Sequence, residues 1–599
     1  MKRTLTIKSS DHTHGTLARR KNDIVTRSWT RALLIGACGS FLVGACSSSD
    51  DTDDDILNDD TNRSIVQLSP ATAASLQGTC EALASSVAGL TNTSIDTSSE
   101  VPAGDLTVGG NDIPAHCLVT GKMNERTSEV DGNAYAISFE MRLPINWNGR
   151  FYHQGNGGID GNVRPAVGAS GGGAETNALY QGFAVLSSDG GHDASLGPTF
   201  GIDPQARLDY GYQATQTLTP MANTVISSAY GRGPDRSYFG GCSNGGRHAF
   251  NAFTRMPESY DGYLAGAPGY NLPKAAIANI FGAQRYATVA TDPTDLSSAF
   301  TAQERGVLAA SVLSSCDTLD GVADGIVADV QACQLAFSLD DVPTCDAERD
   351  GSCLSEEQKV AIAPIFSGAT TSDGTPVYAS FAYDAGIAQN GVAFWEFVAS
   401  LNLDSGAVGM IFGTPPEDPV GFDGPAFSLS ADIDDLVERI NATNELYTES
   451  GLQFATPPDP TSLSAVRDRG AKIMVYHGVS DSIFSAMDSV SWIEGVQANH
   501  ADASEFARLF LVPGMGHCNG GPSTDQFDAL SALVSWVEQG EAPDQLLASA
   551  RGTTNPGGEN EELPADWSGE RTRPLCPYPQ VARYDGSGDV ELAESFACE

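Results

Sequence analysis

Short apolar runs separated by glycine-rich or polar turns predict a series of β-strands along the chain. The clearest is residues 134–143 (AYAISFEMRL), where polar and apolar positions alternate with the period of two that is typical of a half-buried strand. Other apolar runs predict further strands at 151–154, 184–188, 237–240, 471–476 and 507–512.

Longer stretches with helical periodicity lie between these strands. Residues 208–230 predict a helix, in which Pro220 marks a point where the helix can bend, and residues 526–539 predict an amphipathic helix. Strands that alternate with helices in this way indicate an α/β fold.

Residues from about 270 to 459 have a different character. They contain four cysteines, an Asp-rich loop and helical stretches such as 392–401, but few apolar runs that would form strands. We interpret this segment as a domain inserted between two halves of one core.

The composition supports a large folded protein and excludes some classes of function. The chain has 599 residues, of which 41% are hydrophobic, so a disordered or fibrous protein is excluded for most of it. Asp and Glu number 76 against 33 Lys and Arg, a formal net charge of −43. Because nucleic acids bind to basic surfaces, this charge argues against a nucleic-acid partner.

The N-terminal residues are typical of an export signal. A basic segment, 2–31, precedes an apolar stretch, 32–45, that is too short to span a bilayer. Val43-Gly44-Ala45-Cys46 resembles a bacterial lipobox, so we expect a lipid anchor on Cys46; Cys38 is a weaker match, and the alternative is an ordinary secretory signal. The Asp-rich run that follows predicts a solvated tether. We therefore expect an outer-membrane lipoprotein or a secreted protein.

Of the 12 cysteines, all but Cys38 and Cys46 follow this leader, and an even number in an exported protein indicates disulfides. The close pairs 316/333, 345/353 and 576/598 suggest local cross-links, and Cys80 with Cys117 is a fourth candidate pair. Cys242 and Cys518 then remain for each other, although they are far apart in the sequence.

Gly241-Cys242-Ser243-Asn244-Gly245 fits the G-x-S-x-G pattern of a nucleophile elbow. Glycines permit a strained turn from a strand into a helix, which lifts the serine hydroxyl clear of the sheet. An apolar run precedes the motif, and residues 246–250 can begin a helix. Ser243 is therefore the candidate nucleophile; the alternative is a glycine turn with a solvent-facing serine.

A nucleophilic serine requires a base, and the base requires an acid that orients it. His517 follows the predicted strand 507–512 on a glycine-rich loop, and Asp481 follows the strand 471–476. The order Ser, Asp, His is that of α/β-hydrolases. The alternatives are His477 as base and Asp488 as acid; His192 and His248 are interpreted as structural residues.

If Ser243 and His517 meet, the neighbouring Cys242 and Cys518 must also lie close together. A disulfide between them would hold the hydroxyl and the imidazole in place, and closing so long a loop is worth on the order of 4–5 kcal/mol.

The oxyanion that develops when a serine attacks a carbonyl group needs two N–H donors. One candidate is the backbone N–H of Asn244, which directly follows the nucleophile. The other is expected from the loop Gly155-Asn156-Gly157-Gly158, where Gly157 and Gly158 are both candidates. The alternative for this loop is a simple tight turn.

These motifs resemble the tannase/feruloyl esterase family of α/β-hydrolases over roughly residues 75–599. The resemblance is carried by 241–246, 513–518, 147–150 with 155–158, and 182–192. A cysteine beside both the serine and the histidine makes the match specific, and the cysteine pattern most resembles the mono(2-hydroxyethyl) terephthalate hydrolase branch. The resemblance implies the disulfides Cys80–Cys117, Cys242–Cys518, Cys316–Cys333, Cys345–Cys353 and Cys576–Cys598.

The resemblance also implies an α/β-hydrolase core with a large inserted lid domain. We therefore expect a lipoprotein-type signal peptide at 1–45 and an acidic tether at 46–74. The core is expected to consist of 75–269 and 460–599, with a lid domain at 270–459.

The lid of the resembled family carries a structural calcium ion, and residues 316–326 match that stretch. Carboxylates and carbonyls are the hard oxygen ligands that Ca²⁺ prefers. The expected ligands are the side chains of Asp317, Asp320 and Asp324 and the carbonyls of Val322 and Ile326. The alternative is a solvated acidic turn.

The resemblance implies a serine esterase that acts on small esters of aromatic acids, of the feruloyl, galloyl or terephthalate type. Phe484 matches an aromatic residue that lines the substrate site of the terephthalate branch; the alternative is a core phenylalanine. Phe412 is a further candidate for packing on the substrate ring. That branch binds the free carboxylate of its substrate with a lid arginine, whereas this chain has no arginine between Arg349 and Arg439. Because a buried carboxylate without a cation is costly, neutral or phenolic aromatic esters are equally compatible with the sequence.

Two other functions compete with this interpretation. One is a catalytically inactive, calcium-stabilised surface binding protein of hydrolase fold, which the intact Ser243, Asp481 and His517 disfavour. The other is a lipase or peptidase of the same fold; the acidic lid without a long apolar surface helix disfavours a lipase.

Overall fold

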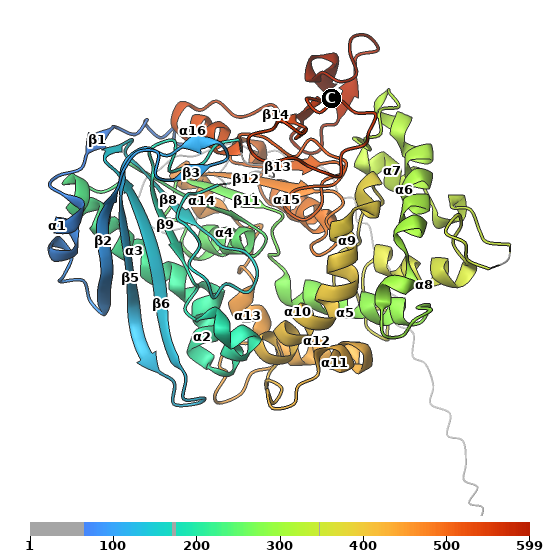
Figure 1. Cartoon of the computed structure of the whole chain (residues 1–599), viewed down its shortest axis with the longest axis horizontal. Coiled ribbons are helices and arrows are strands. Elements are labelled where there is room, and N and C mark those ends of the chain that lie inside the picture. Colours follow the sequence, from blue (N-terminus) through green and yellow to red (C-terminus); the bar gives the residue numbers. More distant parts are fainter. Residues whose placement is uncertain (1–64, 170–174, 347) are drawn as a thin grey trace, which may run out of the picture. The chain divides into compact units, whose positions relative to one another are not determined.

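In the computed structural model, which describes residues 65–169, 175–346 and 348–599, a nine-stranded sheet forms the centre of the fold (Figure 1). The strand order is β13-β12-β11-β10-β8-β9-β6-β5-β2. Neighbours from β13 to β9 are parallel, whereas the pairs from β9 to β2 are antiparallel. The strands are β2 (Thr93–Val101), β5 (His116–Thr127), β6 (Ala134–Pro144), β8 (Arg150–Gln154), β9 (Ala184–Ser188), β10 (Arg236–Cys242), β11 (Gly262–Gly266), β12 (Lys472–Gly478) and β13 (Ala507–Val512).

The α/β prediction is confirmed, and so are all six strands that the apolar runs predict, which are β6, β8, β9, β10, β12 and β13. The pattern does not predict β2, whose residues TSIDTSSEV are mostly polar. Because β2 lies at the edge of the sheet, it does not need the apolar side chains of a central strand.

Side chains along the strands alternate between two hydrophobic clusters, one on each face of the sheet. In β10, Phe239 packs into the first cluster and Tyr238 into the second; in β12, Val475 and Met474 divide in the same way. One face is covered by α3 (Ala214–Tyr230), α4 (Asn244–Arg255) and α15 (Ala486–Asn499), and the other by α16 (Ala529–Gln539).

The two predicted helices are confirmed with different boundaries. The stretch 208–230 is three consecutive segments, α2 (Pro204–Leu208), a π-helical turn η2 (Asp209–Gln213) and α3. Helix α16 begins at Ala529 rather than at 526, because the Asp528 side chain caps it by accepting the N–H of Ser531.

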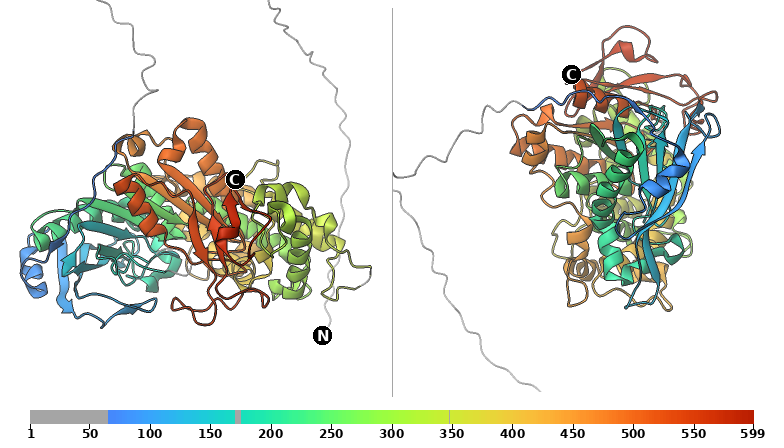
Figure 2. Two further views of the ribbon diagram at one scale, coloured as in Figure 1. Left: turned by 90° about the horizontal axis from the view of Figure 1, so that it is seen from above. Right: turned by 90° about the vertical axis from the view of Figure 1, so that its left-hand side faces the viewer.

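The segment between β11 and β12 is the lid, a helical insertion beside the sheet (Figures 1 and 2). Helix α5 joins its two apolar clusters, since Ile277 and Ile280 pack in one and Tyr286 in the other. Lid and core form one compact unit, Ser64–Glu599, and the expected boundaries at 270 and 460 stay predictions. The lid helices are α5 (Leu272–Ala287), α6 (Ala302–Cys316), α7 (Val330–Ala336), α8 (Glu356–Ser367), α9 (Asn390–Phe394), η7 (Trp395–Ala399), α10 (Ser400–Gly406), η8 (Ala407–Phe412), α11 (Gly424–Ser430), α12 (Ile433–Asn441) and α13 (Gly451–Ala455).

The first described residues pack on the core, although the sequence analysis places them in the tether. The N–H of Ala71 donates to Glu538 and that of Thr72 to Asp235, and β1 (Ala74–Ser75) pairs with β7 (Asn146–Trp147). The folded chain therefore begins before residue 75. The predicted signal peptide, Cys46 and the Asp-rich run lie outside the described residues.

The C-terminal segment crosses from the core to the lid, where it lies beside α6 and α7 (Figure 1, red). It contains the paired strands β14 (Leu546–Ser549) with β15 (Thr572–Leu575) and β16 (Ala582–Tyr584) with β17 (Phe596–Cys598). Arg583 forms an ion pair with Asp329 of the lid at 2.7 Å, and Arg573 pairs with Asp324. Elsewhere in the core, outside the C-terminal segment, lie four shorter elements: β3 (Thr107–Val108), β4 (Asn111–Asp112), α1 (Cys80–Ser86) and α14 (Ser464–Arg469).

Five disulfides cross-link the described chain, in the same pairs that the family resemblance implies: Cys80–Cys117, Cys242–Cys518, Cys316–Cys333, Cys345–Cys353 and Cys576–Cys598. Such a number is typical of proteins that fold in an oxidising compartment. Among the residues that the structure describes, no helix is both long and apolar enough to cross a bilayer.

The lid contains a buried carboxyl group, Asp404 of α10, that gives a testable pH dependence. Its side chain accepts a hydrogen bond from Asn279 at 3.3 Å, and burial raises its pKa from about 3.8 to about 8. Because the pKa of this carboxyl group is raised in the folded protein, its contribution to the free energy of unfolding is fully present below the ordinary pKa. That contribution is lost as the pH rises toward 8. Asp404→Asn should therefore melt higher than the wild type at pH 8.5, by on the order of 2 °C, and the difference should shrink toward pH 5.

Thermal melts from pH 5 to pH 8.5 measure this effect. The matched control is Asp435→Asn, a change at an exposed carboxylate on α12, which should follow the wild type at every pH. A difference between Asp404→Asn and the wild type that does not change with pH would contradict the assignment.

Candidate active site

Ser243 lies in a strained turn between β10 and α4. Its backbone has φ 65° and ψ −126°, a left-handed conformation that non-glycine residues rarely adopt. The turn is possible because Gly241 and Gly245 leave room for the neighbouring loop: a Cβ atom on either would lie 2.3–2.4 Å from the carbonyl oxygen of Gly155. The predicted elbow is therefore present, with the serine at the start of a helix.

Ser243, His517 and Asp481 form a continuous series of hydrogen bonds. His517 Nε2 lies 2.8 Å from Ser243 Oγ, and His517 Nδ1 lies 2.7 Å from Asp481 Oδ2. Asp481 follows β12 and His517 follows β13, so both side chains come from the carboxyl ends of parallel strands. In this arrangement the imidazole can accept the serine proton while the carboxylate orients the ring.

The Asp481 carboxylate is buried but remains a strong acid. Burial alone would raise its pKa, but the electrostatic interaction with His517 and hydrogen bonds from His477 and His517 hold the pKa well below its usual range. Its other oxygen accepts the backbone N–H groups of Ile483 and Phe484 at 3.0 and 3.1 Å. An ionised carboxylate at this place stabilises the positive charge that the imidazole acquires.

Neither alternative candidate is placed as a base or acid for Ser243: His477 Nε2 lies 3.4 Å from Asp481, on the loop of the acid. His477 contacts Ser489 Oγ at 2.8 Å and the carbonyl of Phe484 at 2.9 Å, so its ring supports the loop that carries Asp481. Asp488 accepts hydrogen bonds from Tyr270 and Asn271 at the start of α15.

A lid residue that the sequence analysis missed, Asp384, connects the loops of the acid and the base. Its carboxylate accepts a hydrogen bond from Ser480 Oγ at 2.6 Å and one from the N–H of Gly514 at 2.7 Å. Ser480 precedes Asp481, and Gly514 lies in the loop that ends at His517. The lid therefore helps to position both side chains, a role that nothing in the local sequence around Asp384 indicates.

Two aromatic rings stand edge-on to the imidazole. The centroid of Trp395, at the start of η7 in the lid, is 5.0 Å from that of His517, and the centroid of Phe484 is 5.3 Å away. The sequence analysis predicts Phe484 at the site and misses Trp395. Phe412, its other candidate, is 0% exposed and packs against Phe454 in the apolar core of the lid, so its ring presents no surface to a ligand.

The structure distinguishes between Gly157 and Gly158, the two glycines proposed as oxyanion donors, by their distance from Ser243. A Cβ atom on Gly157 would lie 3.8 Å from Ser243 Cβ, whereas one on Gly158 would have no atom within 4 Å. The backbone of Gly157 is therefore the one that lies beside the serine. Asn244 occupies the first position of α4, directly after Ser243.

The predicted calcium ligands share one loop of the lid. Asp320 is 3% exposed; burial, together with the negative charges of Asp324 and Asp317, raises its pKa to about 7. Asp317 accepts the N–H groups of Asp324 and Gly325, and Asp324 pairs with Arg573. The donor chemistry suits Ca²⁺. Within the described chain, however, no three acidic, histidine or cysteine side chains converge as a metal cluster would.

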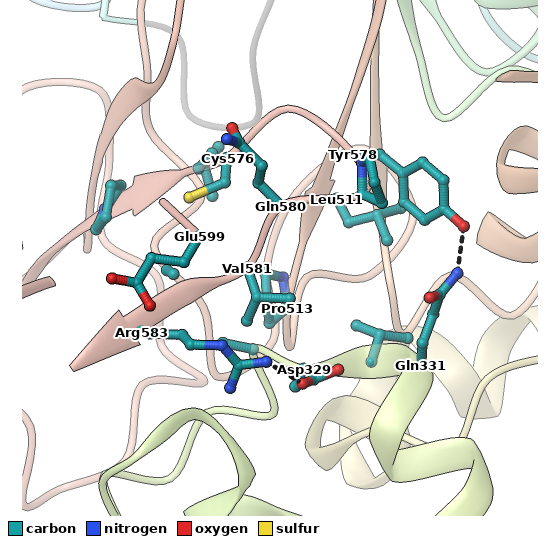
Figure 3. Close-up of a pocket in the computed structure, with 16 residues that line it drawn as sticks. Asp329, Gln331, Leu511, Pro513, Cys576, Tyr578, Gln580, Val581, Arg583 and Glu599 are labelled. Atoms are coloured by element: carbon teal, nitrogen blue, oxygen red, sulfur yellow. Dashed lines mark hydrogen bonds and ion pairs between the residues drawn. The ribbon is translucent and has the colours of Figure 1, made fainter. Parts of the chain in front are cut away.

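A cavity of about 250 Å³ lies between the lid and the C-terminal segment (Figure 3). Asp329 and Gln331 line it from the lid and Leu511 and Pro513 from the end of β13, and the Arg583–Asp329 ion pair closes one side. Ser243, Asp481 and His517 do not line this cavity, so it is separate from the candidate active site.

The sheet order and the serine elbow after β10 together define an α/β-hydrolase. The chain belongs to the tannase and feruloyl esterase family, whose model matches residues 117–599, and it is a carboxylic ester hydrolase. It is 39% identical to the mono(2-hydroxyethyl) terephthalate hydrolase of Piscinibacter sakaiensis over 532 residues, which cover 81% of this chain and 85% of that protein. Feruloyl esterase B of Aspergillus niger is 26% identical over 490 residues, covering 77% and 83% of the two chains.

Solved structures agree in fold. Feruloyl esterase B from Aspergillus oryzae superposes with a TM-score of 0.68 at 24% identity, covering 87% of this chain and 100% of that one. Tannin acyl hydrolase from Aspergillus niger gives a TM-score of 0.62 at 20% identity, covering 88% and 96%.

Removing the Cys242–Cys518 disulfide should affect both activity and stability. Its two half-cystines flank Ser243 and His517, and their Cα atoms are 6.1 Å apart. Replacing both by serine should lower kcat by about tenfold, since misplaced catalytic groups lose rate steeply. It should also lower stability by about 5 kcal/mol, as expected for so long a loop. Ester hydrolysis and thermal melting measure the two effects.

The control for this variant is the double serine substitution of Cys576 and Cys598, a pair separated by 22 residues. It should cost about 3 kcal/mol by the same loop argument and leave kcat unchanged. Equal losses of kcat in the two variants would show that the Cys242–Cys518 bond has no special effect on the site.

Proposed function

We propose that this protein hydrolyses esters of aromatic carboxylic acids through an acyl-enzyme on Ser243. The observation that carries the proposal is the series from Ser243 Oγ through His517 to Asp481, with steps of 2.8 and 2.7 Å. The named activities of the relatives, a terephthalate monoester hydrolase and a feruloyl esterase, support the aromatic acyl group.

The reaction takes two acyl transfers. His517 Nε2 accepts the Ser243 proton as Oγ attacks the ester carbonyl, and the negative oxygen is stabilised by the N–H groups of Asn244 and Gly157. The C–O bond of the ester then breaks, and the alcohol leaves with the proton from His517. Water, deprotonated by the same imidazole, hydrolyses the acyl-enzyme and releases the acid.

Aromatic side chains beside the imidazole support an aromatic substrate. The rings of Trp395 and Phe484 both lie nearly perpendicular to His517. Trp395 is half-buried, so part of its ring is open to pack on a substrate ring, whereas Phe484 is 3% exposed and mainly supports the imidazole. A substrate whose acyl group carries a free carboxylate, as the terephthalate monoester does, has less support. Arg247, next to the elbow, is fully buried and donates to the carbonyls of Tyr210, Gly211 and Ala455. Arg439 of the lid is paired with Glu417.

Substitution of the nucleophile tests the proposal. Ser243→Ala should lower kcat for methyl ferulate by on the order of 10⁴-fold or more, since the hydroxyl forms the covalent intermediate. It should also abolish labelling by a serine-reactive phosphonate. Ser491→Ala, at an exposed serine of α15, should keep both.

The outcomes separate the competing functions. An unlabelled wild type that folds normally would favour the inactive binding protein. Among methyl ferulate, methyl gallate and the terephthalate monoester, we expect the two methyl esters to have the higher kcat/KM, by about tenfold, because neither Arg247 nor Arg439 is free to pair with the charged acyl group. Preferential cleavage of the monoester would overturn this part of the proposal.

We further propose a structural calcium ion at Asp317, Asp320 and Asp324, with the carbonyls of Val322 and Ile326. The support is that Asp320 is buried and forms no ion pair with a cationic side chain of the described residues, which is costly unless a bound cation offsets the charge. The ion would supply that charge and tie the loop to the rest of the lid, away from the ester chemistry.

Chelation tests the calcium proposal. EGTA should lower the melting temperature, and saturating Ca²⁺ at about 100 times its Kd should restore about 2.7 kcal/mol of stability. Asp320→Asn should remove this response, whereas Asp340→Asn, at an exposed carboxylate of the lid, should keep it. A wild type that melts identically with EGTA and with Ca²⁺ would contradict a calcium site.

We also propose that the chain is exported and held at the membrane by a lipid on Cys46. The five disulfides support export.

A further inference from the structure

A buried carboxylate that the mechanism does not use, Asp160, lies behind the two proposed oxyanion donors. Its side chain is 2% exposed, and its backbone has φ 58°, the left-handed conformation. Oδ2 of Asp160 is 3.0 Å from Asn244 Nδ2 and 2.8 Å from His248 Nε2. This one oxygen therefore accepts two hydrogen bonds from α4, the helix that begins after the nucleophile.

The side chain of Asn244 is held between two opposite charges. Its NH₂ group faces the Asp160 carboxylate, and its Oδ1 accepts a hydrogen bond from Arg247 Nε at 2.6 Å. A primary amide between a carboxylate and a guanidinium has only one favourable orientation. The Arg247 charge also offsets the carboxylate, so that the negative charge of Asp160 is not left uncompensated near a developing oxyanion.

His248 contributes a donor and no charge. Burial lowers the pKa of His248, and the neighbouring Arg247 lowers it further, so the ring is neutral near pH 7. Nε2 then carries the hydrogen that is donated to Asp160.

Asp160 belongs to the same loop as Gly157. Upstream in this loop, the carbonyl of Asn156 lies 3.4 Å from Asn244 Nδ2, and the side chain of Asn156 donates to Ser187 and Ser188. Gly190 leaves the space that the carboxylate occupies, because a Cβ atom there would lie 2.8 Å from Asp160 Oδ2. The carboxylate thus ties the loop of one oxyanion donor to the helix of the other.

We infer that Asp160 is a positioning residue of the oxyanion hole: it holds the Gly157 loop against the start of α4, so that the N–H groups of Gly157 and Asn244 point at one oxygen atom. This inference rests on the proposed function. An oxyanion donor stabilises the tetrahedral intermediate and contributes little to binding of the product acid. Loss of Asp160 should therefore weaken the binding of tetrahedral species more than the binding of the acid.

The experiment compares Asp160→Asn and Asp160→Ala in the full-length protein. With p-nitrophenyl benzoate, kcat/KM should fall by about 10- to 100-fold in the alanine variant. The asparagine variant should lie between it and the wild type, since one amide oxygen can still accept from Asn244. The Ki of phenylboronic acid, which forms a tetrahedral adduct with the serine, should rise by a similar factor, while the Ki of benzoate should stay within about twofold.

The matched control is Asp261→Asn. Asp261 is also a buried carboxylate, but it bonds Ser237 and Arg469 at the opposite end of β10. It should change melting temperature without changing the ratio of the two Ki values. Equal weakening of phenylboronate and benzoate in the Asp160 variants, or a kcat/KM within twofold of the wild type in Asp160→Asn, would overturn the inference.

Ser243→Ala, assayed in parallel, separates this inference from the proposed function. Activity that survives Ser243→Ala would overturn the proposed function itself. An inactive Ser243→Ala beside a fully active Asp160→Asn would overturn only the role of Asp160. If Asp160→Ala does not fold, the asparagine variant decides the outcome.

Discussion

The hydrogen bond between Ser243 and His517 is the interaction on which the rest of the site depends. It joins residues 274 positions apart, so its 2.8 Å length has to be set by the whole fold. Three separate features act on it: the left-handed backbone of Ser243, the parallel pairing that brings the ends of β10 and β13 to one edge of the sheet, and the adjacent Cys242–Cys518 bridge. Each restricts a different freedom, namely the direction of the hydroxyl, the position of the strands and the separation of the two turns.

The lid is part of this arrangement and not only a cover over it. Asp384 accepts hydrogen bonds from both loops that carry the acid and the base, and Trp395 packs against the base itself. A buried carboxylate bound by two loops resists their separation, since each loop would leave an unpaired polar group behind. The lid sequence therefore affects both the geometry of the imidazole and the surface that a substrate ring would meet.

The charged side chains around the elbow compensate one another. The chain is strongly acidic, yet next to Ser243 a carboxylate, an amide and a guanidinium compensate one another within one buried network. Buried charges are tolerated where every partner is present. The acidic loop of the lid differs, because Asp320 has no such partner among the described side chains, and this contrast is what supports a bound cation there.

Much of this protein follows from its sequence alone. Runs of alternating or continuous apolar residues identify six strands of the sheet, because burial on one or two faces requires that pattern, and the G-x-S-x-G turn identifies Ser243, because only small residues allow a serine in that backbone conformation. Asp384, Trp395 and Asp160 could not be recognised in this way, since each acts on residues far away in the chain and has no local signature. Phe412 shows the opposite kind of error: the sequence makes it a candidate for contact with the substrate, whereas the structure buries it in the core of the lid. Local patterns determine which elements form and which residues are reactive. Only packing between distant segments decides which side chains meet, because that depends on the three-dimensional path of the backbone between them.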